Sequence, residues 1–128
     1  MMTDTDLIAA YLAHAKTTMR DGTDAAYSDA PAELDSLVTD EPERAWPVLR
    51  EIIRSISRED EDILAYVAAG PLENILVHHP YAVIDRIEAL ARSDSHFRRA
   101  VSGVWGWNRI PPDVRERLDK ILGDEPRL

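Results

Sequence analysis

The chain has 128 residues, of which 45% are hydrophobic and 30% charged, and its formal net charge is −9. This composition is typical of a folded domain with its own core and excludes a disordered chain. No apolar run approaches the roughly 20 residues of a membrane span, which excludes a transmembrane helix. Cysteine is absent, which excludes disulfides and thiolate metal sites.

The beginning of the chain is unlike a secretory signal, because residues 1–12 carry Asp4 and Asp6 but no Lys or Arg. We therefore expect a cytoplasmic protein that does not associate with a membrane.

The charge is unevenly distributed, and all of the excess lies in the first half. Residues 1–64 hold 15 acidic and 6 basic side chains, whereas residues 65–128 hold 9 of each. An acidic half disfavours direct binding to nucleic acid, since that affinity depends on cations that neutralise phosphates. It permits association with a basic protein surface. The alternative is that the acidic surface only keeps the protein soluble and monomeric.

The first two helices are expected over residues 4–19 and from about Pro31 to Thr39. Thr3 or Thr5 can cap the first helix, and the sequence Arg20-Asp21-Gly22 ends it. The stretch 23–30 is ambiguous, with Ser28 or Asp29 as a cap for the second helix. The apolar faces are formed by Leu7, Ile8, Tyr11, Leu12 and Ala15 in the first helix and by Leu34, Leu37 and Val38 in the second.

The third helix has the strongest amphipathic pattern in the chain. Asp40 is its expected cap, and Glu43 stands at the capping-box position. Pro47 lacks the N–H that would bond the Glu43 carbonyl, so we expect a kink or an irregular first turn there. The apolar stripe consists of Trp46, Leu49, Ile52, Ile53 and Ile56.

A run of charges, Arg58 to Asp62, precedes the fourth helix. Its carboxylates stand where the positive end of the helix dipole favours them. The run does not have the pattern of an EF-hand calcium loop, because it lacks the alternating ligands and the central glycine. The carboxylates in question are Asp60, Glu61 and Asp62.

A sharp corner between two helices is predicted at mid-chain. Gly70 can adopt the left-handed conformation that ends a helix, and Pro71 suits the first position of the next one. Glu73 then lies in the first turn of that next helix. The helix is expected to end at His78-His79, where the dipole favours histidine.

The remaining helices follow the same periodicity. Pro80 opens one helix, and Asp94 or Ser95 caps the next, which is expected to extend to Trp105. A last helix precedes Gly123 and Pro126. The apolar positions of these helices are Val83, Ile84, Ile87, Leu90, Ala91, Phe97, Ala100, Val101, Val104, Val114, Leu118, Ile121 and Leu122.

An internal repeat appears when Pro42 is aligned with Pro80, an offset of 38 residues. Upstream of the prolines, Leu37-Val38 matches Leu76-Val77, although one residue fewer separates the second pair from its proline. This favours an all-α fold of about seven or eight short helices in stacked antiparallel hairpins, HEAT/armadillo-like, with an irregular helical bundle as the alternative. We expect a single helical domain, residues 1–128, with repeat units near 31–69 and 71–105.

No pattern of catalysis or cofactor binding is present. Phosphate loops and nucleophile elbows are missing, and adjacent residues such as His78 and His79 point about 100° apart on a helix, so they do not readily share one metal. We therefore expect a protein that is not an enzyme and holds no cofactor or metal.

The least ordinary stretch is Gly103 to Arg109, with two tryptophans around a glycine. We expect Trp105 to complete a core stripe. Two interpretations remain open for Trp107 and Arg109. They pack the last helix onto the preceding one, or they form a binding hot spot, where Trp and Arg are enriched.

Several segments together resemble a family of small bacterial domains of unknown function. The resemblance covers about residues 42–107 and implies an all-helical domain with no established activity. The resemblance also suggests that Glu73, Glu88 and Arg92 form a buried ion-pair network with a role in folding. The segments are Ala68-Ala69-Gly70-Pro71-Leu72-Glu73, Ile84-Asp85-Arg86-Ile87-Glu88, Ala91-Arg92, Phe97-Arg98-Arg99-Ala100 and Val104-Trp105.

The resulting hypothesis is a non-catalytic protein–protein interaction module, for example an immunity-type protein that binds and neutralises a partner with a basic surface. Its candidate binding residues are Trp107 and Arg109, and Asp60, Glu61 and Asp62. The alternatives are an acidic DNA-mimicking inhibitor of a nucleic-acid enzyme and an unrecognised enzyme.

Overall fold

The computed structural model describes residues 3–21 and 28–128, and the described part is helical with no strand. The first helix extends to Asp21, two residues beyond its predicted end at residue 19. Gly22 and residues 23–27 of the ambiguous stretch lie outside the described residues. The elements are α1 (Asp4–Asp21), α2 (Ala30–Asp40), α3 (Pro42–Arg54), α4 (Glu61–Val67), η1 (Ala68–Leu72), α5 (Glu73–His78), α6 (Pro80–Ser93), α7 (Ser95–Val101), η2 (Trp107–Arg109) and α8 (Pro112–Leu122).

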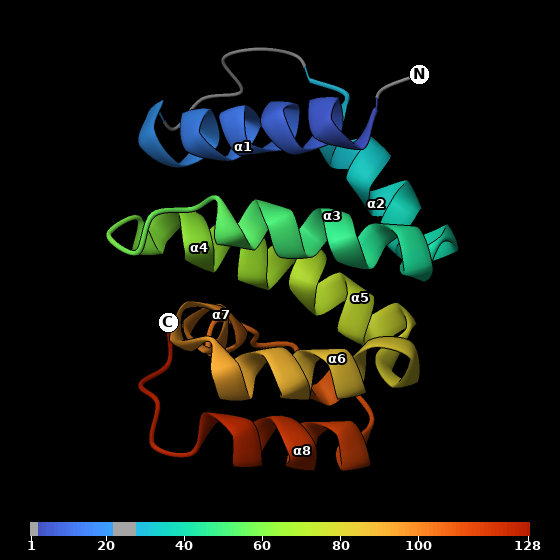
Figure 1. The fold of residues 1–128 in the computed structure, drawn as a ribbon, viewed down its shortest axis with the longest axis vertical. Helices are drawn as coiled ribbons and strands as arrows, with labels where there is room; N and C mark the ends of the chain where they lie inside the picture. The colour runs from blue at the N-terminus through green and yellow to red at the C-terminus, as the bar shows by residue number, and fades with distance from the viewer. Residues whose placement is uncertain (1–2, 22–27) are drawn as a thin grey trace.

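The helices stack in successive layers from α1 at one end of the molecule to α8 at the other (Figure 1). Helix α1 packs on α3, α3 on α6, and α6 on α8. Helices α2 and α5 connect these layers and contact each other. The all-α stack predicted from the periodicity is confirmed.

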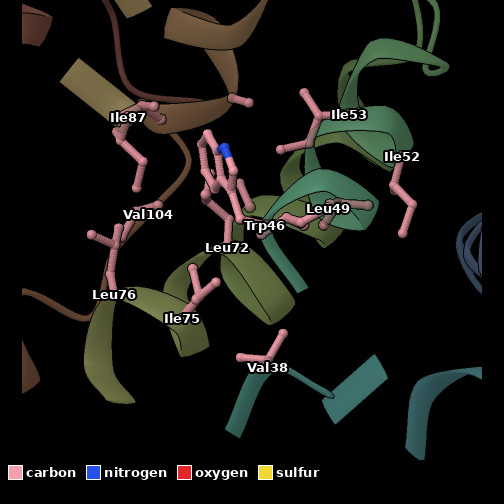
Figure 2. Close-up of a cluster of buried hydrophobic side chains, with 14 of the residues drawn as sticks. Val38, Trp46, Leu49, Ile52, Ile53, Leu72, Ile75, Leu76, Ile87 and Val104 are labelled. Carbon is pink, nitrogen blue, oxygen red and sulfur yellow. The ribbon is translucent and has the colours of Figure 1, made fainter. Parts of the chain in front are cut away.

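The core is centred on α3, as its apolar stripe predicted. Trp46 is buried and meets the Phe97 ring edge-on, with 5.9 Å between the centroids. Figure 2 shows side chains from α3, η1, α5 and α6 gathered around Trp46. Leu49, Ile52 and Ile53 are fully or almost fully buried. Burial of side chains of this size stabilises the fold by about 1.5–3 kcal/mol each.

The 38-residue offset has a direct counterpart in the structure. The helical stretches Ala30–Asp40 and Ala68–His78 are each followed by one linking residue and then by a helix that begins with proline. The linking residues have nearly the same conformation, with φ −138° and ψ 67° at Glu41 and φ −138° and ψ 55° at His79.

The alignment of the two units needs one correction. Without any gap, Leu37 corresponds to Ile75, and these residues accept the N–H of Glu41 and of His79, each at 2.8 Å. The predicted pairing of Leu37-Val38 with Leu76-Val77 is therefore wrong by one residue. The buried positions agree with the gap-free alignment: Ala30, Leu34, Leu37 and Val38 in one unit, and Ala68, Leu72, Ile75 and Leu76 in the other.

The predicted mid-chain corner is present as a kink at Gly70, but the conformation of this glycine differs from the prediction. Gly70 has φ −101° and ψ −105°, which is not helical and not left-handed either. Two helical stretches meet at this kink, and the N–H of Glu73 donates to the carbonyl of Ala68 across it. Pro71 directly follows Gly70, and α5 begins at Glu73. The missing N–H of Pro71 costs no helical hydrogen bond, because Pro71 stands where the second stretch starts.

The predicted helix caps have mixed outcomes. Asp94 is confirmed, because its carboxylate accepts the N–H groups of His96 at 3.0 Å and Phe97 at 3.1 Å. Thr3 is confirmed for α1, since its hydroxyl accepts the N–H of Asp6 at 3.1 Å. Asp40 is not a cap: it is the last residue of α2, and Glu41 stands before α3.

Helix α3 runs through Pro47 from Pro42 to Arg54 without a break, so the expected irregular turn is absent from this described helix. Pro47 is exposed, so water can reach its side of the helix.

Candidate interaction site at the tryptophan loop

The segment between α7 and α8, residues 102–111, is called the tryptophan loop here. Helix α7 ends at Val101, earlier than expected, so Trp105 does not continue its apolar stripe. Val104 is buried, but Trp105 is 57% exposed. The prediction that Trp105 belongs to the core is therefore wrong, because the chain leaves the helical period before reaching it.

The loop is held by the carboxylate of Glu73, which is buried at the start of α5. One oxygen accepts the main-chain N–H groups of Trp105 at 3.0 Å and Gly106 at 2.8 Å. The other accepts the guanidinium of Arg109. Three donors therefore satisfy a carboxylate whose burial would otherwise be strongly unfavourable.

Two glycines allow the loop to approach the helices closely. A Cβ atom on Gly106 would lie 2.7 Å from the Glu73 carboxylate. A Cβ atom on Gly103 would lie 2.8 Å from the Cβ of Ala68. Both distances are far below van der Waals contact, so the loop geometry depends on glycine at these positions.

Arg127 lies between the two tryptophans of the loop. Its guanidinium carbon is 4.7 Å from the centroid of the Trp105 ring and 4.6 Å from that of Trp107. The guanidinium also donates to the main-chain carbonyl of Val104. Burial lowers the pKa of Arg127, an effect that the charge of Asp119 partly opposes. In the described part of the chain, no carboxylate lies within 4 Å of this guanidinium.

The segment that carries Arg127, residues 123–128, is called the tail segment here. It begins at Gly123, which ends α8 as expected and has a positive φ of 52°. Its Leu128 donates its N–H to the Ser102 carbonyl at 3.3 Å and accepts the indole N–H of Trp105 at 3.1 Å. Arg99 also donates to the main-chain carbonyl of Pro126. The tail segment is thus bound to the tryptophan loop by side chains and by one main-chain hydrogen bond.

An open groove of about 390 Å³ borders Trp107 on the α8 side. Its other walls are Pro112, Arg115, Glu116 and Asp119. The Nε of Arg115 is buried and has no hydrogen-bond partner among the described residues. The groove therefore combines an aromatic wall, two carboxylates and a guanidinium.

Residues 16–125 match the profile of a family described as a family of unknown function (DUF6869). The chain belongs to this family. The matched range includes Glu73 and the tryptophan loop, and Arg127 lies just beyond it. No curated protein and no solved structure matches the chain.

The predicted acidic binding residues lie at the start of α4 and are partly neutralised. Asp60 pairs with Arg20 at 2.9 Å, and Glu61 pairs with Arg99 at 2.6 Å. Asp62 is exposed in the first turn of α4. Arg99 also holds the tail segment, so it links the acidic run to the tryptophan loop. Two of these three carboxylates are thus paired with arginines of the same chain. This run therefore offers few unpaired negative charges that could imitate the phosphates of DNA.

The ion-pair network suggested by the resemblance divides into two separate clusters. Glu73 pairs with Arg109, whereas Glu88 pairs with Arg92 at 3.3 Å and with Arg117 at 3.1 Å. Arg92 is 71% exposed, so that contact is not buried. The hydrogen bond from Arg117 lowers the pKa of Glu88. The prediction of one buried network of Glu73, Glu88 and Arg92 is therefore wrong.

The paired histidines lie at the end of α5, where they were expected. His79 bonds the Thr39 carbonyl through Nε2 at 2.6 Å, while His78 is exposed. No group of three or more metal-ligating side chains occurs within residues 3–21 and 28–128. Among the described helices, none combines the length and apolar character required to cross a bilayer.

Sequence reasoning singled out Trp107, Arg109 and Glu73 but did not bring them together, and it missed Arg127. The two glycines around Trp105 were the available signal of a close-packed loop. Nothing in the local sequence connects Arg127 to tryptophans some 20 residues earlier, since only the fold places them in contact.

Proposed function

We propose that this protein is a non-catalytic protein-binding module whose contact surface is centred on Trp105. The observation that carries the proposal is an indole 57% exposed on a loop whose main chain is held by a buried carboxylate. Tryptophan and arginine are the side chains most enriched at interface hot spots. Trp105, Trp107 and Arg109 together supply such a surface.

The fixed main chain of the loop supports this role. A side chain presented by an ordered backbone loses less conformational entropy on binding than one on a mobile loop. Glu73 and Gly106 supply this order without covering the indole of Trp105. The half-exposed Arg109 guanidinium keeps part of its surface available while one side contacts Glu73.

The net charge of −9 favours a partner with a basic surface, since opposite charges accelerate association. An immunity-type protein that binds and neutralises such a partner is the specific form of this proposal. In that form, binding of the module blocks the activity of the partner, and the module contributes no catalytic group.

The test is a comparison of two aromatic variants of the tagged protein in source-cell extract. Tyr81 is 64% exposed and serves as the matched control for Trp105. We expect a stoichiometric partner to be retained by wild type and by Tyr81→Ala but lost by Trp105→Ala. The captured protein is then purified, and its Kd for Trp105→Ala should be at least about tenfold higher than for wild type.

Equal affinity of the two variants would overturn the assignment of the surface to Trp105. If no protein binds the wild type at stoichiometric level, the module proposal itself fails. Inhibition of the purified partner by wild type but not by Trp105→Ala would support the immunity-type form, and an unchanged partner activity would remove it.

A further inference from the structure

The arrangement of Trp105, Arg127 and Trp107 has the geometry of an aromatic cage with a cation inside it. The guanidinium lies within 4.7 Å of both ring centroids. Cations within about 6 Å of an indole face are attracted by its quadrupole, and aromatic cages use this attraction to recognise cationic ligands. Here the occupant comes from the chain itself.

The occupant is held mainly by the cage. Its only other hydrogen bond in the described structure goes to the Val104 carbonyl. A guanidinium normally forms a bidentate pair with a carboxylate when it leaves water, and this one does not. Its main chain belongs to the tail segment, which follows the end of α8, and the main-chain hydrogen bonds of this segment to α8 come from Gly123 and Glu125 rather than from Arg127. Removal of the Arg127 side chain from the cage therefore breaks no hydrogen bond within a helix, while Leu128 of the tail segment packs against the core independently of the cage.

We propose that the space between Trp105 and Trp107 is a binding site for an arginine side chain of a partner protein, which Arg127 occupies within the chain. This inference rests on the proposed function and names the chemistry of the partner residue that enters the surface. Arg127 acts as an internal competitor, and a partner arginine that enters the cage displaces it together with the tail segment.

The groove beside Trp107 supports a basic partner segment. Glu116 and Asp119 line it, so cationic side chains next to the inserted arginine meet carboxylates. The planar guanidinium stacks on both indoles, a contact that the compact ammonium of lysine does not reproduce.

The test uses the full chain with Arg127→Ala, which empties the cage, and N-acetyl-arginine amide as the probe. Tryptophan indole N–H signals are followed by two-dimensional nitrogen–proton NMR. The chain has three tryptophans, and the buried Trp46 is the internal control. We expect saturable shifts of the Trp105 and Trp107 signals and an unchanged Trp46 signal. Wild type should bind the probe at least about tenfold more weakly, because the tethered Arg127 competes at high effective concentration.

Two matched controls define the chemistry of the site. N-acetyl-alanine amide at equal ionic strength should cause no saturable shift, and Arg127→Ala combined with Trp105→Ala should lose binding of the arginine probe. Arg127→Gln is a second variant that removes the guanidinium from the cage. Its amide still reaches toward the Val104 carbonyl, and the variant should bind the probe as Arg127→Ala does. Far-UV circular dichroism and the Trp46 signal report that each variant is folded.

Folded Arg127→Ala and Arg127→Gln proteins that show no saturable shift would overturn the proposal and leave the cage as a clamp for the tail segment. Tighter binding of tetramethylammonium than of N-acetyl-arginine amide would also overturn the arginine assignment, in favour of a small quaternary ammonium ligand. Failure of this probe assay is distinguishable from failure of the proposed function, because the partner comparison of Trp105→Ala with Tyr81→Ala does not depend on the cage being emptied.

Discussion

Glu73 and Arg109, separated by 36 positions in the chain, form an ion pair that joins the start of α5 to the tryptophan loop. The carboxylate is buried, whereas the guanidinium is 52% exposed. This asymmetry makes Glu73 the anchor of the pair, because its second oxygen also accepts two main-chain N–H groups of the loop.

Replacement of Glu73 by alanine should destabilise the protein and loosen the loop. It leaves the N–H groups of Trp105 and Gly106 without their acceptor, and an unsatisfied buried donor costs about 1–3 kcal/mol. Urea denaturation should show this loss in the free energy of unfolding. The matched control is Glu116→Ala, which removes an exposed carboxylate of α8 and should change stability by less than about 0.5 kcal/mol. Similar values for the two variants would contradict the anchoring role.

Gly106→Ala should be destabilising for a steric reason. The new methyl group would be built 2.7 Å from the Glu73 carboxylate, so the loop or the carboxylate must move. Overpacking of this kind costs about 1–3 kcal/mol. Thermal unfolding should give a lower Tm, while Ala82→Ser on the exposed face of α6 should leave it almost unchanged. A wild-type Tm for Gly106→Ala would show that the loop adapts without strain.

Two tryptophans that look alike in sequence should respond oppositely to truncation. Trp46→Ala removes a buried ring from the core and should cost about 3–5 kcal/mol. Trp105→Ala removes an exposed ring and one cation–π contact, so it should cost about 0.5–2 kcal/mol. Chemical denaturation of both variants measures this difference. Equal losses of stability would mean that Trp105 belongs to the core, as the apolar periodicity predicted.

The hydrogen bond from Arg117 lowers the pKa of Glu88 from its ordinary value of 4.5. A carboxylate with a depressed folded-state pKa stabilises the protein above its unfolded-state pKa and loses this contribution as the pH falls through the folded-state value. The stability difference between wild type and Glu88→Gln should therefore be larger at pH 7 than at pH 3. Urea titrations at the two pH values measure it. A pH-independent difference would mean that the pair with Arg117 does not form in solution.

Features that depend on neighbours along the chain could be predicted from the sequence. The apolar stripe from Trp46 to Ile56, the cap at Asp94 and the glycine that ends α8 are local, because a helix is defined by contacts three to five residues apart. The all-α fold and the 38-residue offset follow from these same patterns, since prolines and apolar faces recur at equal spacing.

The assembly of the candidate site depends on contacts between distant segments and could not be predicted from the sequence. Helix α7 ends before Trp105 because Glu73, on another helix, accepts the N–H groups of the loop in place of helical carbonyls. The partner of Arg109 and the cage around Arg127 likewise depend on segments that are far apart in the chain. Periodicity carries no information on which distant carboxylate or ring will be near, because that choice is made by the packing of the helices on one another.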